Sequence, residues 1–182
     1  MNVKMNANAK RKSGAAMQTV PRQLATSTDL KPDDVRTIAQ TVNPLVADAI
    51  ALYVKTKNFH WHLTGPYFRD YHLLFDEQAA AILESVDALA ERVRKIGGTT
   101  IHSIGEVGRL QTISDDDDEL VPSPEMIRRL LADNRHMAEQ QRKAIEVSDS
   151  RGDTPTGNLL QEILDETERR IWFLFELSQS EK

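Results

Sequence analysis

Residues 57–98 read KNFHWHLTGPYFRDYHLLFDEQAAAILESVDALAERVRKIGG and combine three histidines with many carboxylates on otherwise amphipathic helical patterns. On the second of these patterns, four potential metal ligands share one side. At 100° per residue they fall at about 0°, 40°, 60° and 100° around the helix: His72, Asp76, Asp87 and Glu91. This side adjoins the apolar stripe, where burying unpaired charges costs roughly several kcal/mol. The negative charges of these acids must therefore be balanced by a positively charged partner.

Apolar periodicity around this stretch predicts an all-α chain. We expect long helices over about 33–62, from the TGP at 64–66 to about 96, over 124–147 and over 154–178, with a short one at 104–110. Pro44 interrupts the first pattern, and we favour a kink there over a second start capped by Asn43. Ser123 marks the start of the third long helix. One long connection among four helices is typical of a ferritin-like four-helix bundle with a short extra helix in its crossover.

Composition sets limits on the class of protein. The 182 residues are 40% hydrophobic and 5% aromatic, with 8 glycines, 7 prolines and no cysteine. Without cysteine, any metal site must use nitrogen and oxygen ligands. The sequence lacks the apolar core of a secretory signal and a run of about 18 apolar residues. We expect a soluble, cytoplasmic protein with no membrane contact and no organic cofactor.

Charge is distributed unevenly. Residues 1–28 hold five cations and no acid, which gives +5 and leaves −10 for residues 29–182 of a chain whose net charge is −5. The cations are Lys4, Lys10, Arg11, Lys12 and Arg22. Such a segment lacks apolar periodicity and is expected to be disordered. We therefore predict a basic tail over 1–30, a bundle over 31–182 and DNA binding by the tail; a merely solubilising or artificial tail is the alternative.

The four potential ligands on the second helix form two separate pairs. His72 with Asp76 is one i, i+4 pair, and Asp87 with Glu91 is the other. Asp76 and Asp87 are about 16 Å apart along the helix axis, so one ion cannot touch both pairs. Each pair alone offers two ligands, fewer than the four to six that a divalent cation takes.

A two-fold axis would complete both pairs. Two antiparallel copies of this helix place the first pair of one chain opposite the second pair of the other, which makes two equivalent sites per dimer. His60 lies twelve residues before His72 across a tight turn and can join the first pair. A solvated acidic face and a hydrogen-bonded histidine remain the alternatives. Asp133 and His136 come nearest to the Glu-x-x-His pattern of intrachain di-iron bundles, and we interpret them as surface groups.

The same stretch closely resembles the Dps family, the mini-ferritins also called DNA-protection-during-starvation proteins. The resemblance covers the His-Trp pair at 60–61, the histidine twelve residues later, the aspartate four beyond, DALAER and the GG stop, and extends loosely over 33–178. It implies a hollow homododecamer with iron sites at the two-fold interface. His60, His72 and Asp76 correspond to ligands from one subunit, with Asp87 and Glu91 from its neighbour. His62 is not counted as a ligand.

The resemblance also implies an activity. The family oxidises Fe(II), typically with hydrogen peroxide, and stores the ferric product. Trp61 is a candidate electron donor, with a packing aromatic as the alternative. Asp149 and Asp153 are candidates for lining a three-fold pore, whereas Asp115–Asp118 is expected to be a solvated loop.

Two functions compete. The first is a nucleoid-associated ferroxidase and iron store. The second is a structural DNA-coating protein of the nucleoid whose metal site is vestigial or binds zinc. A bundle that serves only as an interaction module is disfavoured by the five matching ligand positions.

Overall fold

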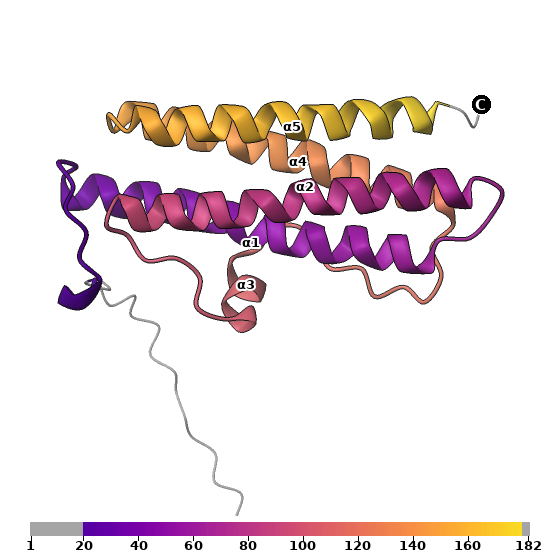
Figure 1. Ribbon diagram of the computed structural model, residues 1–182, viewed down its shortest axis with the longest axis horizontal. Coiled ribbons are helices and arrows are strands. Elements are labelled where there is room, and N and C mark those ends of the chain that lie inside the picture. Colours follow the sequence, from indigo (N-terminus) through magenta and orange to yellow (C-terminus); the bar gives the residue numbers. More distant parts are fainter. Residues whose placement is uncertain (1–19, 180–182) are drawn as a thin grey trace, which may run out of the picture.

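The computed structural model describes residues 20–179, which form helices and loops (Figure 1). The helices, in chain order, are η1 (Arg22–Leu24), α1 (Pro32–His62), α2 (Phe68–Lys95), α3 (Ile104–Leu110), α4 (Ser123–Ser150) and α5 (Thr154–Ser178). The predicted all-α class is confirmed, and each predicted helix is present.

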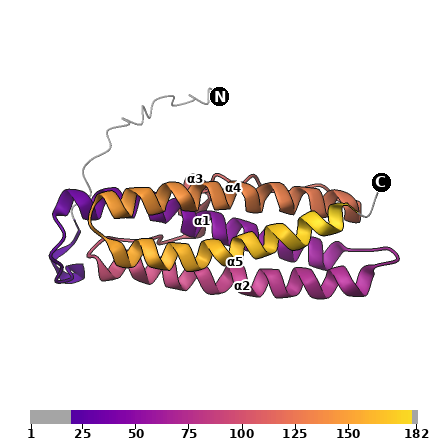
Figure 2. The ribbon, with the colours of Figure 1, turned by 90° about the horizontal axis from the view of Figure 1, so that it is seen from above.

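The four long helices form two antiparallel hairpins (Figures 1 and 2). Residues 63–67 join α1 to α2, and Arg151–Asp153 joins α4 to α5. Residues 96–122, which include α3, cross from one hairpin to the other. Besides its hairpin partner, α1 packs against α4 and α2 packs against α5, so the core lies among all four helices.

Helix α1 is the most deeply buried of the four. Its apolar residues Ile38, Val42 and Leu52 have no exposed surface. Pro44 lies inside one continuous helix, and Asn43 does not cap a second one, because its amide donates to Thr99 O in the crossover at 2.9 Å. By length and composition α1 could also cross a membrane, but half of its most apolar window, of mean hydropathy 1.2, is buried inside the fold.

α2 ends at the predicted GG stop, and each of the two glycines is required for a different reason. Gly97 adopts φ +90°, a left-handed conformation that favours glycine after a helix end. A Cβ at Gly98 would lie 2.9 Å from Val93 Cγ1 and 3.1 Å from Ala39 Cβ. The second glycine therefore lets the chain pass close to α1 and α2.

The crossover is anchored to α1 by a buried carboxylate. Asp48 has no exposed surface and accepts hydrogen bonds from Thr112 N at 2.5 Å, Thr112 Oγ1 at 2.8 Å and Ile113 N at 3.0 Å. Thr112 Oγ1 also lies 2.6 Å from His136 Nε2 on α4.

Two predicted surface groups are therefore not free surface groups. His136 contacts the crossover, and Asp133 pairs with Lys55 on α1 at 2.8 Å, with side chains only 17% and 7% exposed. The sequence prediction missed these roles because each partner lies far away in the chain.

The acidic loop is exposed to solvent at Asp115, Asp117 and Asp118, as predicted, but not at Asp116. Arg129 on α4 pairs with Asp116 at 2.8 Å and with Asp118 at 2.7 Å, and the Asp116 side chain is only 4% exposed. Ser123 is the first residue of α4 rather than its cap, and its hydroxyl donates to Thr64 O at 2.8 Å.

The last part of the predicted tail contacts the bundle. Thr26 Oγ1 donates to Arg94 O at 3.1 Å, and Arg94 Nη2 donates to Leu24 O at 2.7 Å. Disorder up to residue 30 is thus not supported for this segment. The tail cations Lys4, Lys10, Arg11 and Lys12 lie outside the described residues.

Candidate metal centre

The α1–α2 hairpin brings two histidines, one from each helix, into contact. His60, two residues before the end of α1, stacks on His72 in the second turn of α2, with ring centroids 3.7 Å apart and planes 21° apart. The short turn between the helices sets this register. The twelve-residue spacing in the sequence therefore becomes a pair of neighbouring imidazoles.

Each of these histidines is oriented by the backbone of the other. His60 Nδ1 lies 2.8 Å from His72 O, and His72 Nδ1 lies 3.1 Å from His60 O. A carbonyl only accepts, so each Nδ1 carries a proton, and in a neutral imidazole the lone pair is then on Nε2. This arrangement presents Nε2 as a metal ligand in a defined orientation.

Asp76 lies one turn beyond His72 on α2. Its Oδ1 accepts from Lys57 Nζ at 2.6 Å. The Lys57 hydrogen bond and charge hold the pKa of Asp76 below its ordinary value, with smaller contributions from His60 and His72. Asp76 is therefore a carboxylate at neutral pH. The Lys57 ammonium occupies the position from which a metal ion would bind this carboxylate.

Lys57 was missed by the sequence prediction, although a signal existed. It lies three residues before His60 and so shares its helix face. The side chain is 16% exposed, and its Nζ lies 5.9 Å from the Trp61 ring centroid. Trp61 itself is 62% exposed in the subunit, so it does not pack in the subunit core.

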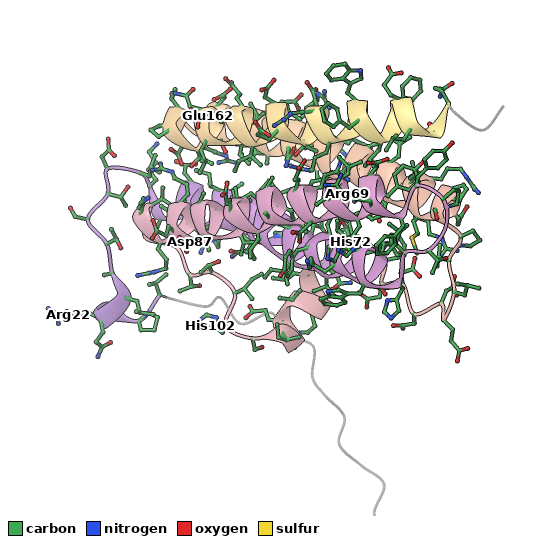
Figure 3. All side chains as sticks on the ribbon, turned by 45° about the vertical axis from the view of Figure 1, so that its right-hand side comes forward. Arg22, Arg69, His72, Asp87, His102 and Glu162 are labelled. Atoms are coloured by element: carbon green, nitrogen blue, oxygen red, sulfur yellow. The ribbon has the colours of Figure 1, made fainter. Side chains whose placement is uncertain are left out.

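The second acid pair lies farther along α2 (Figure 3). Asp87 is exposed, and Glu91 pairs with Lys95 at 3.1 Å with both side chains largely in solvent. Over residues 20–179, no three His, Asp or Glu side chains are grouped closely enough to hold a metal ion within one chain. Each subunit thus offers two separate fragments of the predicted site. The first fragment is His60, His72 and Asp76, and the second fragment is Asp87 and Glu91.

Apolar residues lie uncovered between the two fragments. Leu83 is 47% exposed and falls at about 20° on the helix wheel, between His72 and Asp76. Ala80 is exposed on the same side. Exposed apolar surface flanked by charge is typical of a protein–protein interface.

The two candidate pore residues have different environments. Asp149 is exposed near the end of α4. Asp153 is 2% exposed, caps α5 through Thr156 N at 3.3 Å and pairs with Arg92 Nη2 on α2 at 2.5 Å. Its contacts therefore hold α2 to the α4–α5 hairpin, and the pore assignment of both residues stays a prediction. Arg22, the one described tail cation of the predicted DNA contacts, is exposed in η1.

The donor set fits iron. Two imidazole nitrogens and one carboxylate are ligands suited to Fe(II), and carboxylate oxygens favour Fe(III) further. The same donors also bind zinc, so the metal is not decided by the donors alone.

Known proteins share this fold and are related to the chain in sequence. The ferritin-like domain family matches residues 39–180. DNA protection during starvation protein 1 of Deinococcus radiodurans is 26% identical over 168 residues, which cover 92% of this chain and 81% of that protein. DpsC of Streptomyces coelicolor superposes with a TM-score of 0.80 at 29% identity, over 87% of this chain and 95% of its own.

A third relative links the fold to metal chemistry. The Dps protein of Vibrio cholerae O1, described as a member of a broad superfamily of ferritin-like diiron-carboxylate proteins, superposes with a TM-score of 0.79 at 25% identity, over 84% of this chain and 96% of its own. The matched region reaches from α1 to the end of α5, and Dps proteins recur among the relatives by sequence and by structure. The chain therefore belongs to the Dps family of ferritin-like proteins.

Proposed function

We propose that this chain is the subunit of a ferroxidase and iron store, a hollow homododecamer that oxidises Fe(II) with hydrogen peroxide at sites shared between two subunits. One observation carries the proposal. The reciprocal hydrogen bonds of His60 and His72 leave both Nε2 atoms without a partner among the described residues, beside the ionised Asp76.

The two-fold arrangement follows from the face of α2. Antiparallel packing of two α2 helices about a point near Leu83 brings Asp87 and Glu91 of the partner subunit to the first fragment. The same packing covers the exposed apolar residues between the fragments. An isologous interface of this kind makes two equivalent sites.

Fe(II) is the substrate, and the protein supplies ligands and charge. Two Fe(II) ions each lose one electron, and the two electrons reduce one hydrogen peroxide to the oxidation level of water. With two further waters, the products are two FeO(OH) units for storage and four protons. Asp76 and the partner's acids supply the negative charge that favours Fe(III), and Lys57 neutralises Asp76 before iron binds. Trp61 is exposed and adjacent to His60 in the sequence, and in this proposal it donates an electron to a stray radical.

The proposed role includes DNA protection in the cytoplasm, at the nucleoid. The Deinococcus relative bears the name DNA protection during starvation protein. Twelve tails of +5 charge would give many weak phosphate contacts, and multivalency makes such binding salt-sensitive and independent of sequence.

A complementation experiment tests the shared site. His72→Ala/Asp76→Ala removes the first fragment, and Asp87→Ala/Glu91→Ala removes the second, so each variant alone should lose peroxide-driven Fe(II) oxidation. Random co-assembly makes half of the interfaces mixed, and each mixed interface has one complete site of two, so the mixture should regain about a quarter of the wild-type rate.

Other outcomes would point elsewhere. A full rate in the first variant would move the chemistry to other residues. A mixture as inactive as its components would contradict a shared site. Retention of DNA protection in an assembly that binds zinc but does not oxidise Fe(II) would favour the DNA-coating alternative.

A further inference from the structure

A cavity of about 60 Å³ is lined by residues of α2 and α5. These two helices pack against each other (Figure 2). Leu74 and Phe173 contribute apolar walls, and Gln78 and Arg170 contribute polar groups. A buried water takes about 10–15 Å³, so the cavity has room for roughly four waters or one small polyatomic ion.

Arg170 is a buried cation without a carboxylate partner. It is 6% exposed, and among residues 20–179 no carboxylate lies within ion-pair distance of it. Its Nε donates to Asn134 Oδ1 at 2.9 Å and its Nη2 to Thr167 Oγ1 at 2.8 Å, both neutral acceptors. These bonds use two of the five guanidinium N–H groups, and the other three remain available.

Two of the partly buried arginines differ in this respect, whereas Arg94 donates, among the described residues, only to the carbonyls of Gly98 and Leu24. Arg92 pairs with Asp153, and Arg129 pairs with three acids. Burial lowers the pKa of Arg170 to about 10, so its guanidinium is charged at neutral pH. The charge of Glu166 raises the pKa of Arg170 but less than burial lowers it, so this buried charge is only partly compensated.

Gln78 gives an independent indication of a ligand. It is 5% exposed and lines the same cavity, and neither its Nε2 nor its Oε1 has a partner in the described part of the chain. Buried polar groups are nearly always hydrogen-bonded, so an amide with both ends unpaired next to a cavity implies a polar occupant.

The charged residues that line the cavity balance one another. Glu166 and Arg169 line it and lie 3.6 Å apart, which leaves Glu77 as the remaining acid. With Arg170 included, the lining residues have a net charge of zero, and the most buried charge is positive.

We propose that this cavity binds a small oxyanion, with Arg170 supplying its free N–H groups and Gln78 its amide N–H. A guanidinium fork matches the paired oxygens of phosphate or a small carboxylate. The site lies in every subunit and does not require the two-fold interface or iron.

Equilibrium dialysis of the iron-free, full-length assembly against radiolabelled inorganic phosphate tests this proposal. NaCl at about 0.15 M screens the exposed basic tail much more than a buried site. We expect saturation near one phosphate per chain. Gln78→Leu should weaken binding at least tenfold, and Arg170→Met should abolish it. Formate that displaces the phosphate would identify a carboxylate ligand, and formate without effect would identify phosphate.

Gln141→Leu is the matched control. Gln141 is also fully buried with both amide atoms unpaired among the described residues, but it does not line the cavity. Its replacement should leave phosphate binding unchanged, and Gln78→Leu should leave the rate of Fe(II) oxidation unchanged. The proposal is overturned by equal phosphate binding in wild type and Gln78→Leu, by no saturable binding in wild type, or by a crystal grown in phosphate that contains only ordered water in the cavity.

Discussion

Lys57 Nζ lies 2.6 Å from Asp76 Oδ1, so the subunit holds its own cation against the carboxylate of the proposed iron site. An incoming metal ion must displace this ammonium. The ion pair therefore orients Asp76 and, at the same time, weakens metal binding.

Replacing Lys57 by methionine should tighten metal binding. The change keeps the apolar stem over Trp61 and removes the competing charge, so the affinity for Co(II), measured by optical titration, should rise by roughly two- to fivefold. The pKa of Asp76 should rise toward its ordinary value, so metal binding in the variant should fail at a higher pH as the solution is acidified.

Lys95→Met provides the matched control for this change. Lys95 makes an exposed pair with Glu91 at 3.1 Å, in the fragment that the partner subunit would receive. Because both side chains are largely in solvent, its removal should change affinity less than Lys57→Met does. Weaker or unchanged Co(II) binding in Lys57→Met would show that the ammonium does not compete with metal.

Replacing Asp153 by alanine should destabilise the fold. The change leaves Arg92 without its carboxylate and α5 without its cap, which together should lower the free energy of unfolding by about 3 kcal/mol in urea. Asp149→Ala, at an exposed position, should change it by less than about 0.5 kcal/mol.

The same two variants test the pore prediction. If Asp149 lines an entry path, Asp149→Ala should slow iron uptake without loss of stability. Equal stability of the Asp153→Ala and Asp149→Ala variants would contradict the structural role of the Arg92 pair.

Local sequence patterns predicted the helices well. The predictions that failed concern side chains whose partners lie far away in the sequence. The bounds of α1 and α5 lie within about two residues of those expected, because the proline in the first turn of each helix and the TGP break after α1 act within a single turn. The roles of Asp153 and Asp116 depend on Arg92 and Arg129. These partners lie in other segments, so spacing along one helix could not reveal them.

The candidate site was predictable for a related reason. His72 and Asp76 are one turn apart, and the tight turn after α1 brings His60 to them, so sequence distance determines spatial distance. The carbonyl bonds that orient the two imidazoles were not predictable, because any residue can supply a carbonyl.

Replacing Asp48 by alanine should loosen the crossover. The carboxylate accepts three hydrogen bonds from Thr112 and Ile113 in a fully buried position, and alanine has no side-chain acceptor. Leaving buried donors unpaired should cost about 2–3 kcal/mol of unfolding free energy. Hydrogen exchange should show faster exchange at the Thr112 and Ile113 amides, and unchanged exchange there would contradict the anchoring role.

Deleting residues 1–19 should remove DNA binding. The deletion takes away Lys4, Lys10, Arg11 and Lys12, a charge of +4, and spares the segment from Leu24 to Thr26 that bonds to Arg94. Gel retardation at low salt should disappear while the assembly keeps its mass and its rate of Fe(II) oxidation.

A charge-neutral tail separates charge from length. Replacing the same four cations by glutamine keeps all nineteen residues and should abolish retardation as the deletion does. In the wild type, the logarithm of the affinity should fall linearly with the logarithm of salt concentration, because phosphate contacts release counterions. Retardation that survives the glutamine variant would assign DNA binding to the bundle, whose net charge of −10 over residues 29–182 makes it a poor surface for phosphates.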